Sequence, residues 1–111
     1  MSRILINDGK TLLETVILAE TTAERLRGLL GRKSLPADTG MLIRPCRSIH
    51  MWSMRFPIDA AFLDERMQVI KIARNLRPWQ LAFAPGKTAS VLETAAGVMN
   101  AVKVGDTLSI T

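Results

Sequence analysis

The stretch IDAAFLDERMQVIKIA occupies positions 58–73 and contains two apolar runs separated by a charged turn. The runs are Ile58–Leu63 and Val69–Ala73, and Asp64-Glu65-Arg66 lies between them. Short apolar runs bounded by polar turn residues are typical of β-strands. We therefore expect two neighbouring antiparallel strands joined by a tight turn.

Runs of the same kind recur along the rest of the chain. They are Ile4–Ile6, Leu12–Leu18, Met41–Ile43, Ile49–Trp52, Ser90–Leu92 and Thr107–Ile110. Asp8-Gly9, between the first two, tolerates the positive φ angles of a tight hairpin. Helical signals are fewer. One helix is predicted from Thr21, with Glu24 at the capping-box position, to Gly31, and one helical turn is predicted between Thr94 and Val102.

These elements predict a mainly β (α+β) fold. We expect one domain over residues 1–111, a compact antiparallel β-barrel or sandwich with one or two short helices. Alternating strand–helix units are absent, which argues against a parallel sheet. Apolar residues make up 48% of the chain, enough for a buried core, so intrinsic disorder is excluded as a class.

The charge and the single cysteine restrict the class of protein further. Lys and Arg number 15 against 10 acidic residues, a net charge of +5, but no five basic residues are contiguous. A basic protein with scattered charges carries a solvated surface more often than a nucleic-acid stripe. The lone Cys46 cannot form an intrachain disulfide, and we find no signal-peptide core or membrane-spanning apolar segment, so we expect a cytoplasmic protein.

Seven segments recur here in the order of a known family. They are Glu24–Leu30, Ser34–Pro36, Gly40–Leu42, His50–Asp59, Phe62–Asp64, Val91–Glu93 and Val104–Asp106. Together they resemble a widespread family of small bacterial and archaeal proteins named domain of unknown function 192, from about Leu13 to Ile110. The resemblance implies a compact β-rich fold with a short helix between early strands. It implies no reaction and no catalytic residues.

This chain departs from that family pattern in two ways. Many relatives look exported and carry a leader peptide that is not seen here, so we do not expect any periplasmic role of theirs to transfer. Many also carry an amide and a hydroxyl residue after the methionine–basic pair, where this chain has Phe56. A polar site at that position is therefore in doubt.

Three residues are candidates for catalysis: Cys46, His50 and Asp59. These residue types supply a nucleophile, a base and an orienting carboxylate. In an extended strand, however, Cys46 and His50 would be about 13 Å apart. A hairpin turning between Ser53 and Phe56 would instead place His50 opposite Asp59, either as a structural pair or as an acid–base site.

We expect no metal site and no cofactor. A structural zinc site needs four ligands rich in Cys and His, and this chain has one of each. The acidic residues Asp38, Asp64, Glu93 and Asp106 are predicted at turns or strand ends, where Asp commonly accepts hydrogen bonds from backbone amides. Gly105-Asp106 is interpreted as a turn into the last strand, because no glycine-rich loop precedes a helix.

The interpretation we favour is a non-catalytic binding module with a basic and aromatic surface around His50–Asp59. Guanidinium groups and indoles can hold an anionic or planar ligand. The predicted ligand-binding residues are Arg47, His50, Trp52, Met54, Arg55, Asp59, Arg77 and Trp79. The partner would be an unidentified protein or a small anion, and the oligomeric state is open. The alternatives are a hydrolase or transferase that depends on Cys46 or on His50 and Asp59, and an RNA-associated accessory protein.

Overall fold

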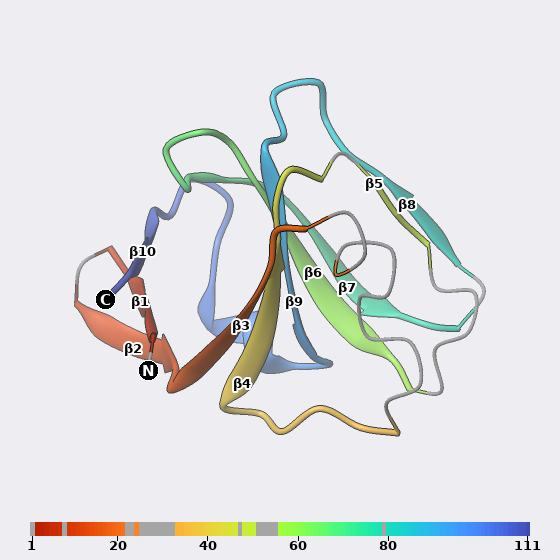
Figure 1. The fold of residues 1–111 in the computed structure, drawn as a ribbon, viewed down its shortest axis with the longest axis horizontal. Helices are drawn as coiled ribbons and strands as arrows, with labels where there is room; N and C mark the ends of the chain where they lie inside the picture. Colours follow the sequence, from red (N-terminus) through yellow and green to blue (C-terminus); the bar gives the residue numbers. More distant parts are fainter. Residues whose placement is uncertain are drawn as a thin grey trace.

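The computed structural model describes residues 2–7, 9–21, 24, 33–46, 48–50, 56–78 and 80–111, with backbone alone for residues 48–50 and 81. The elements in these residues are almost all strands (Figure 1). They are β1 (Ile4–Ile6), β2 (Lys10–Leu13), β3 (Thr15–Ala19), β4 (Thr39–Ile43), β5 (Ser48–His50), β6 (Ile58–Leu63), β7 (Val69–Leu76), β8 (Leu81–Phe83), β9 (Ser90–Ala95), the 3₁₀ turn η1 (Val98–Ala101) and β10 (Leu108–Ile110). None of the described helical segments is long and apolar enough to span a bilayer.

The central element is a five-stranded sheet in the order β3-β4-β9-β6-β7. The predicted β6–β7 hairpin is confirmed, with Ile58 opposite Leu76 and Leu63 opposite Val69. The prediction against parallel pairing is wrong for one pair, because β3 and β4 run parallel in register from Thr15↔Thr39 to Ala19↔Ile43. Parallel neighbours need a long crossover, and residues 20–38 provide it.

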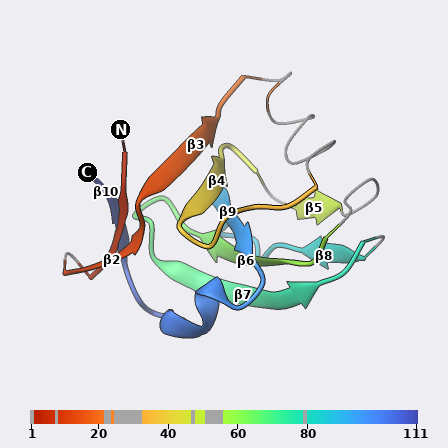
Figure 2. The same ribbon diagram turned by 90° about the horizontal axis from the view of Figure 1, so that it is seen from below.

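Two smaller sheets lie at opposite sides of the central one (Figure 2). One has the order β10-β1-β2, and the other is the β5–β8 ribbon. Because side chains alternate along a strand, the central sheet has two apolar faces. Leu42 and Leu92 lie on one face and pack with Ile4 of β1, whereas Phe62 and Ala60 lie on the other and share a cluster with Ala82 of β8.

This layering explains why every residue of β6 is buried. A strand that is covered on both faces reads as a continuous apolar run rather than as an alternating one. The central sheet ends at β3 and β7 and does not close on itself. The predicted β-rich fold is therefore confirmed, and it is the sandwich-like form rather than the barrel.

Other predicted boundaries differ in detail. The predicted run Leu12–Leu18 is split at Glu14 into β2 and β3, and β8 was not predicted. The predicted helical turn after Thr94 is confirmed as η1, although Thr94 itself belongs to β9.

The capping box of the other predicted helix is formed. The Glu24 N–H donates to Thr21 Oγ1 at 3.1 Å, and the Thr21 N–H donates to Glu24 Oε1 at 3.0 Å. The Thr21 N–H and, at 3.1 Å, the Glu20 N–H donate to the Glu24 carboxylate and lower the pKa of Glu24. The remainder of that helix, residues 25–31, lies outside the described residues.

Candidate functional site

The strand register brings together two segments that the sequence analysis combined into one surface. His50, at the end of β5, is opposite Leu81, at the start of β8. Ile58, at the start of β6, is opposite Leu76, at the end of β7. Connection 51–57 runs from the end of β5 to the start of β6, and connection 77–80 runs from the end of β7 to the start of β8. Because β5 pairs with β8 and β6 pairs with β7, both connections join the same two pairs of strand ends. Residues from both connections were predicted to bind one ligand.

Of the three arginines predicted to bind a ligand, Arg77 is the one that lies within the described residues. Arg77 is exposed, and no described carboxylate lies within ion-pair distance of its guanidinium. Its backbone N–H donates to the side-chain oxygen of Gln80, which closes a short turn. Arg47, Trp52, Met54, Arg55 and Trp79 lie outside the described residues, and His50 is described by its backbone alone. Their binding roles stay predictions.

Phe83 of β8 and Lys71 of β7 meet where the other end of the β5–β8 ribbon contacts the central sheet. Phe83 of β8 is 67% exposed, unusual for a large aromatic side chain. Lys71 of β7 lies over the ring of Phe62 at 5.3 Å, and its ammonium donates a 2.7 Å hydrogen bond to the Phe83 carbonyl. This bond ties the ribbon to the edge of the central sheet.

Asp59 does not face β5 as predicted. The expected hairpin between the His50 segment and β6 is wrong, because β6 pairs with β7 on one side and β9 on the other, while β5 pairs with β8. Both edges of β6 are thus occupied, so strand pairing cannot place His50 opposite Asp59. The alternative of an acid–base pair built on that hairpin loses its geometric basis.

The Asp59 carboxylate is 1% exposed and accepts three backbone amides. Its Oδ1 accepts from Asn75 at 2.8 Å, and its Oδ2 accepts from Gly97 at 2.9 Å and Met99 at 3.1 Å. A buried carboxylate needs such partners to offset its lost hydration. Asp59 therefore fastens β7 and the start of η1 to β6.

Arg74 of β7 holds the other end of η1. Its guanidinium donates to the carbonyl of Met99 at 2.8 Å and to that of Val102 at 3.3 Å. The Met99 carbonyl also accepts the Val102 N–H at 3.0 Å, whereas the Val102 carbonyl lies just past the end of the turn, where helical donors run out. Together Asp59 and Arg74 satisfy both ends of η1 from adjacent strands.

Cys46, the candidate nucleophile, precedes β5 in a loop. Its side chain is half-buried and packs against the core cluster that contains Phe62. Its N–H donates to the Ala89 carbonyl at 3.2 Å, which ties this loop to the residue before β9.

Two of the acidic turn residues have the predicted role. Asp64 Oδ1 accepts the amides of Arg66 and Gln68, both at 2.9 Å. Asp106 Oδ2 accepts the Lys103 amide at 2.9 Å, and this bond is the main cause of a lowered Asp106 pKa. The predicted turn at Gly105-Asp106 is confirmed, since Gly105 has φ of +100°.

Glu93 is the acidic residue for which the turn prediction is wrong. It lies within β9, the middle strand of the sheet, between the cross-strand neighbours Met41 and Ala60. It is 5% exposed, and no described residue forms a hydrogen bond with its carboxyl group. Burial raises its pKa from 4.5 to about 7.

The predicted apolar run ended at Leu92, so Glu93 was placed at a turn or strand end rather than inside the strand. The signal available was the alternation itself. Residue 93 falls on the same face as Val91, a face that is buried in the central strand of a layered fold. A metal role has no support in the described residues, where no three His, Cys, Asp or Glu side chains gather.

The fold and the described site define a small, β-rich, sandwich-like protein, and the comparisons place it in a family. The chain matches the DUF192 family, described as "Uncharacterized ACR", over residues 4–110. It therefore belongs to that family, and the resemblance expected from its segments is confirmed.

Three similar proteins illustrate how far the likeness extends. The UPF0127 protein of Thermococcus sibiricus is 33% identical over 93% of this chain and 71% of its own length. The UPF0127 protein of Thermococcus kodakarensis is 33% identical over 97% of this chain and 73% of its own length. A solved protein of unknown function from Novosphingobium aromaticivorans shares 30% identity and a TM-score of 0.78, covering 85% of this chain and 73% of that chain. None of these names states a reaction or a ligand.

Proposed function

We propose that this protein is a non-catalytic binding module that holds an anionic ligand at the end of the β5–β8 ribbon. One observation carries the proposal. The pairs His50↔Leu81 and Ile58↔Leu76 anchor the connections 51–57 and 77–80 at the same strand ends. On this proposal, the arginines and tryptophans of both connections contribute to one binding region.

The charge of this region supports an anion rather than a cation. Arg77 is exposed and has no described carboxylate beside it, so its charge is available to a ligand. Arg55 belongs to the other connection, and the chain carries a net charge of +5. Guanidinium groups bind carboxylates and phosphates through paired hydrogen bonds, and an indole adds a cation–π or stacking surface.

Tryptophan fluorescence tests this proposal directly, because the only two tryptophans of the chain, Trp52 and Trp79, belong to these connections. Titration with sodium tripolyphosphate at low ionic strength should give a saturable change in emission. The affinity should fall as salt is added, since exposed charges are screened beyond about 8 Å at physiological ionic strength. An absence of saturable change at low salt would refute anion binding.

Matched variants separate a specific site from general attraction to a basic protein. Arg77→Ala should weaken the affinity for tripolyphosphate by about two- to fivefold, as expected for a solvent-exposed ionic contact. Lys10→Ala removes the same charge from exposed β2 and should leave the affinity unchanged. Equal weakening by both variants would indicate nonspecific binding. A partner protein whose binding ignores salt would favour an apolar interface instead.

A further inference from the structure

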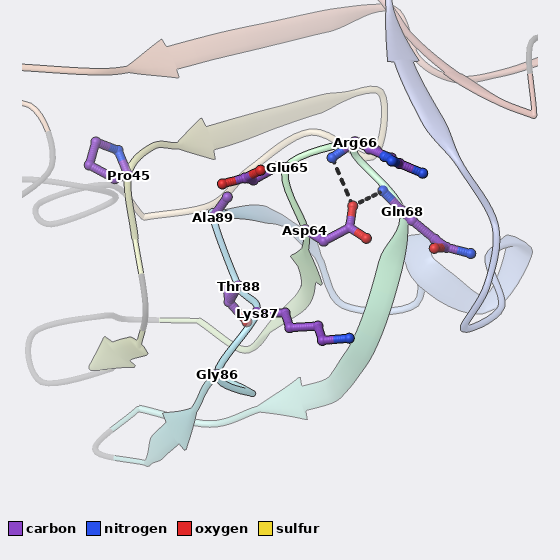
Figure 3. A pocket seen from close by; sticks show the side chains of 9 residues that line it. All are labelled: Pro45, Asp64, Glu65, Arg66, Gln68, Gly86, Lys87, Thr88 and Ala89. Atoms are coloured by element: carbon purple, nitrogen blue, oxygen red, sulfur yellow. Dashed lines mark hydrogen bonds between the residues drawn. The ribbon is translucent and has the colours of Figure 1, made fainter.

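A cavity of about 550 Å³ lies at the opposite end of β6 from the proposed anion site (Figure 3). It is bounded by the β6–β7 turn, by the loop before β9 and by Pro45. Its volume is within the usual range for small-ligand sites, about 300–1,000 Å³. The side chains that line it are small or polar, so a large apolar ligand would find little surface to cover.

The backbone on both sides of this cavity is held in place. In the β6–β7 turn, Asp64 Oδ1 accepts the amides of Arg66 and Gln68. In the opposite wall, the Ala89 N–H donates to the Leu63 carbonyl at 2.8 Å and the Thr88 N–H donates to the Pro85 carbonyl at 3.0 Å. A site with a fixed backbone loses less entropy when it binds a ligand.

Four charged residues line the cavity: Asp64, Glu65, Arg66 and Lys87. The ion pairs found in the described part of the chain, Arg3–Glu14 and Arg44–Glu20, involve none of them. Figure 3 shows the Lys87 side chain extending from the loop before β9, while the Asp64 carboxylate is directed to the Arg66 and Gln68 amides of its own turn. The cavity therefore presents charges of both signs that do not neutralise each other by direct contact.

This arrangement selects for the charge of a ligand. A simple anion would be repelled by two carboxylates, and a metal cation would be repelled by a guanidinium and an ammonium. A molecule that carries one ammonium and one carboxylate can pair each of its charges with an opposite group.

Thr88 provides an independent observation. It lines the cavity, it is 5% exposed, and its hydroxyl has no hydrogen-bond partner among the residues that the structure describes. Buried polar groups are nearly always hydrogen-bonded, and each exception calls for an explanation. Because the hydroxyl oxygen itself has almost no accessible surface, a ligand oxygen can become its partner only after a small shift of the loop that carries Thr88.

We propose that this cavity binds a small zwitterion of the amino-acid class. Its ammonium group pairs with Asp64 and Glu65, its carboxylate pairs with Lys87 and Arg66, and the Thr88 hydroxyl donates to that carboxylate. This site is distinct from the proposed anion site, and either can fail without the other.

Residue-resolved NMR of the ¹⁵N-labelled protein tests the proposal. Glycine, L-serine, L-glutamate and L-lysine are titrated separately, with acetate and methylammonium as ligands of a single charge. At least one amino acid should give saturable shifts in the amides of residues 64–68 and 86–89, and acetate and methylammonium should bind several-fold more weakly. Saturation by none of the amino acids, or equal binding of acetate, would overturn the proposal.

Two variants probe the contacts with the amino acid that binds. Lys87→Ala should weaken its affinity about two- to fivefold, whereas Lys10→Ala, a matched loss of one exposed cation, should not. Thr88→Val keeps the shape of the side chain and removes the hydroxyl, so it should also weaken binding while the protein stays folded. Wild-type affinity in both Lys87→Ala and Thr88→Val would refute the assigned contacts.

Discussion

Glu93→Gln tests the most unusual feature of the core, a carboxyl group buried in the middle strand of the sheet. The substitution replaces an ionisable group with a neutral amide of nearly the same shape. The described residues offer the Glu93 carboxyl group no hydrogen bond, so its ionisation destabilises the folded protein. The variant should therefore gain stability over the wild type as the pH rises.

The magnitude follows from the raised pKa. In the unfolded chain Glu93 loses its proton near 4.5, whereas burial keeps the proton on the folded protein until about 7. Between these values the folded state binds more protons than the unfolded state, so the stability of the wild type falls as pH rises. At about 1.4 kcal/mol per pKa unit, the full loss above pH 7 comes to about 3 kcal/mol. Below 4.5 the carboxyl is protonated in both states and causes no loss.

Urea denaturation followed by tryptophan fluorescence measures this effect. The free energy of unfolding is determined for the wild type and Glu93→Gln at about pH 4 and about pH 8. The difference between the two proteins should grow by about 3 kcal/mol between these conditions. Comparing the same pair at two pH values cancels any cost of packing the amide, because that cost does not change with pH. Glu65→Gln, which removes an exposed carboxylate, controls for the change in net charge.

One result would refute this reasoning. If Glu93→Gln and the wild type differ by the same amount at both pH values, within about 0.5 kcal/mol, then the carboxyl ionises as easily in the folded protein as in the unfolded chain. Glu93 would then be stabilised by a partner or by water, and its burial in the sheet would not explain its behaviour.

Three further substitutions test contacts within and beside the central sheet. Asp59→Ala leaves three amides without an acceptor and should lower the free energy of unfolding by about 3 kcal/mol or more in urea titrations; a loss below about 1 kcal/mol would contradict the role assigned to the carboxylate. Arg74→Met keeps the apolar stem of the side chain and removes its hydrogen-bond donors. The Val102 amide, which donates to the Met99 carbonyl, should then exchange faster in hydrogen-exchange NMR. The free energy of unfolding of the whole protein should fall by about 1 kcal/mol or less. Gly40→Ala places a methyl group 2.6 Å from Leu13 Cδ1 and should cost about 1–3 kcal/mol; an unchanged urea midpoint would show that Leu13 moves freely.

The sequence predicted local features well because their causes are local. The β6–β7 hairpin follows from two apolar runs and a turn in which Asp64 accepts amides from Arg66 and Gln68, two and four residues further on. The capping box between Thr21 and Glu24 likewise needs only the right spacing. Such contacts are visible in a linear pattern.

Features that depend on distant partners were not predictable in the same way. β8 is three residues long and pairs with β5, far away in the sequence, so no periodicity marks it. The amides that bind Asp59 come from residues 16, 38 and 40 positions away. Without knowledge of which strands flank β6, the short distance from His50 to Asp59 in sequence suggested a hairpin that the sheet order excludes.

The buried polar side chains differ in a way that separates folding from binding. The Asp59 carboxylate is fully engaged by backbone amides, so it has a structural reason to be buried. Thr88 differs, because its hydroxyl lacks a partner among the described residues, and it lines a cavity whose charged side chains form no ion pairs with one another. The Glu93 carboxyl is also buried without a described hydrogen bond, but of these two groups it is Thr88 that lines the cavity. A partnerless hydroxyl beside a preformed cavity is therefore better evidence for a binding site than any residue that the fold already satisfies.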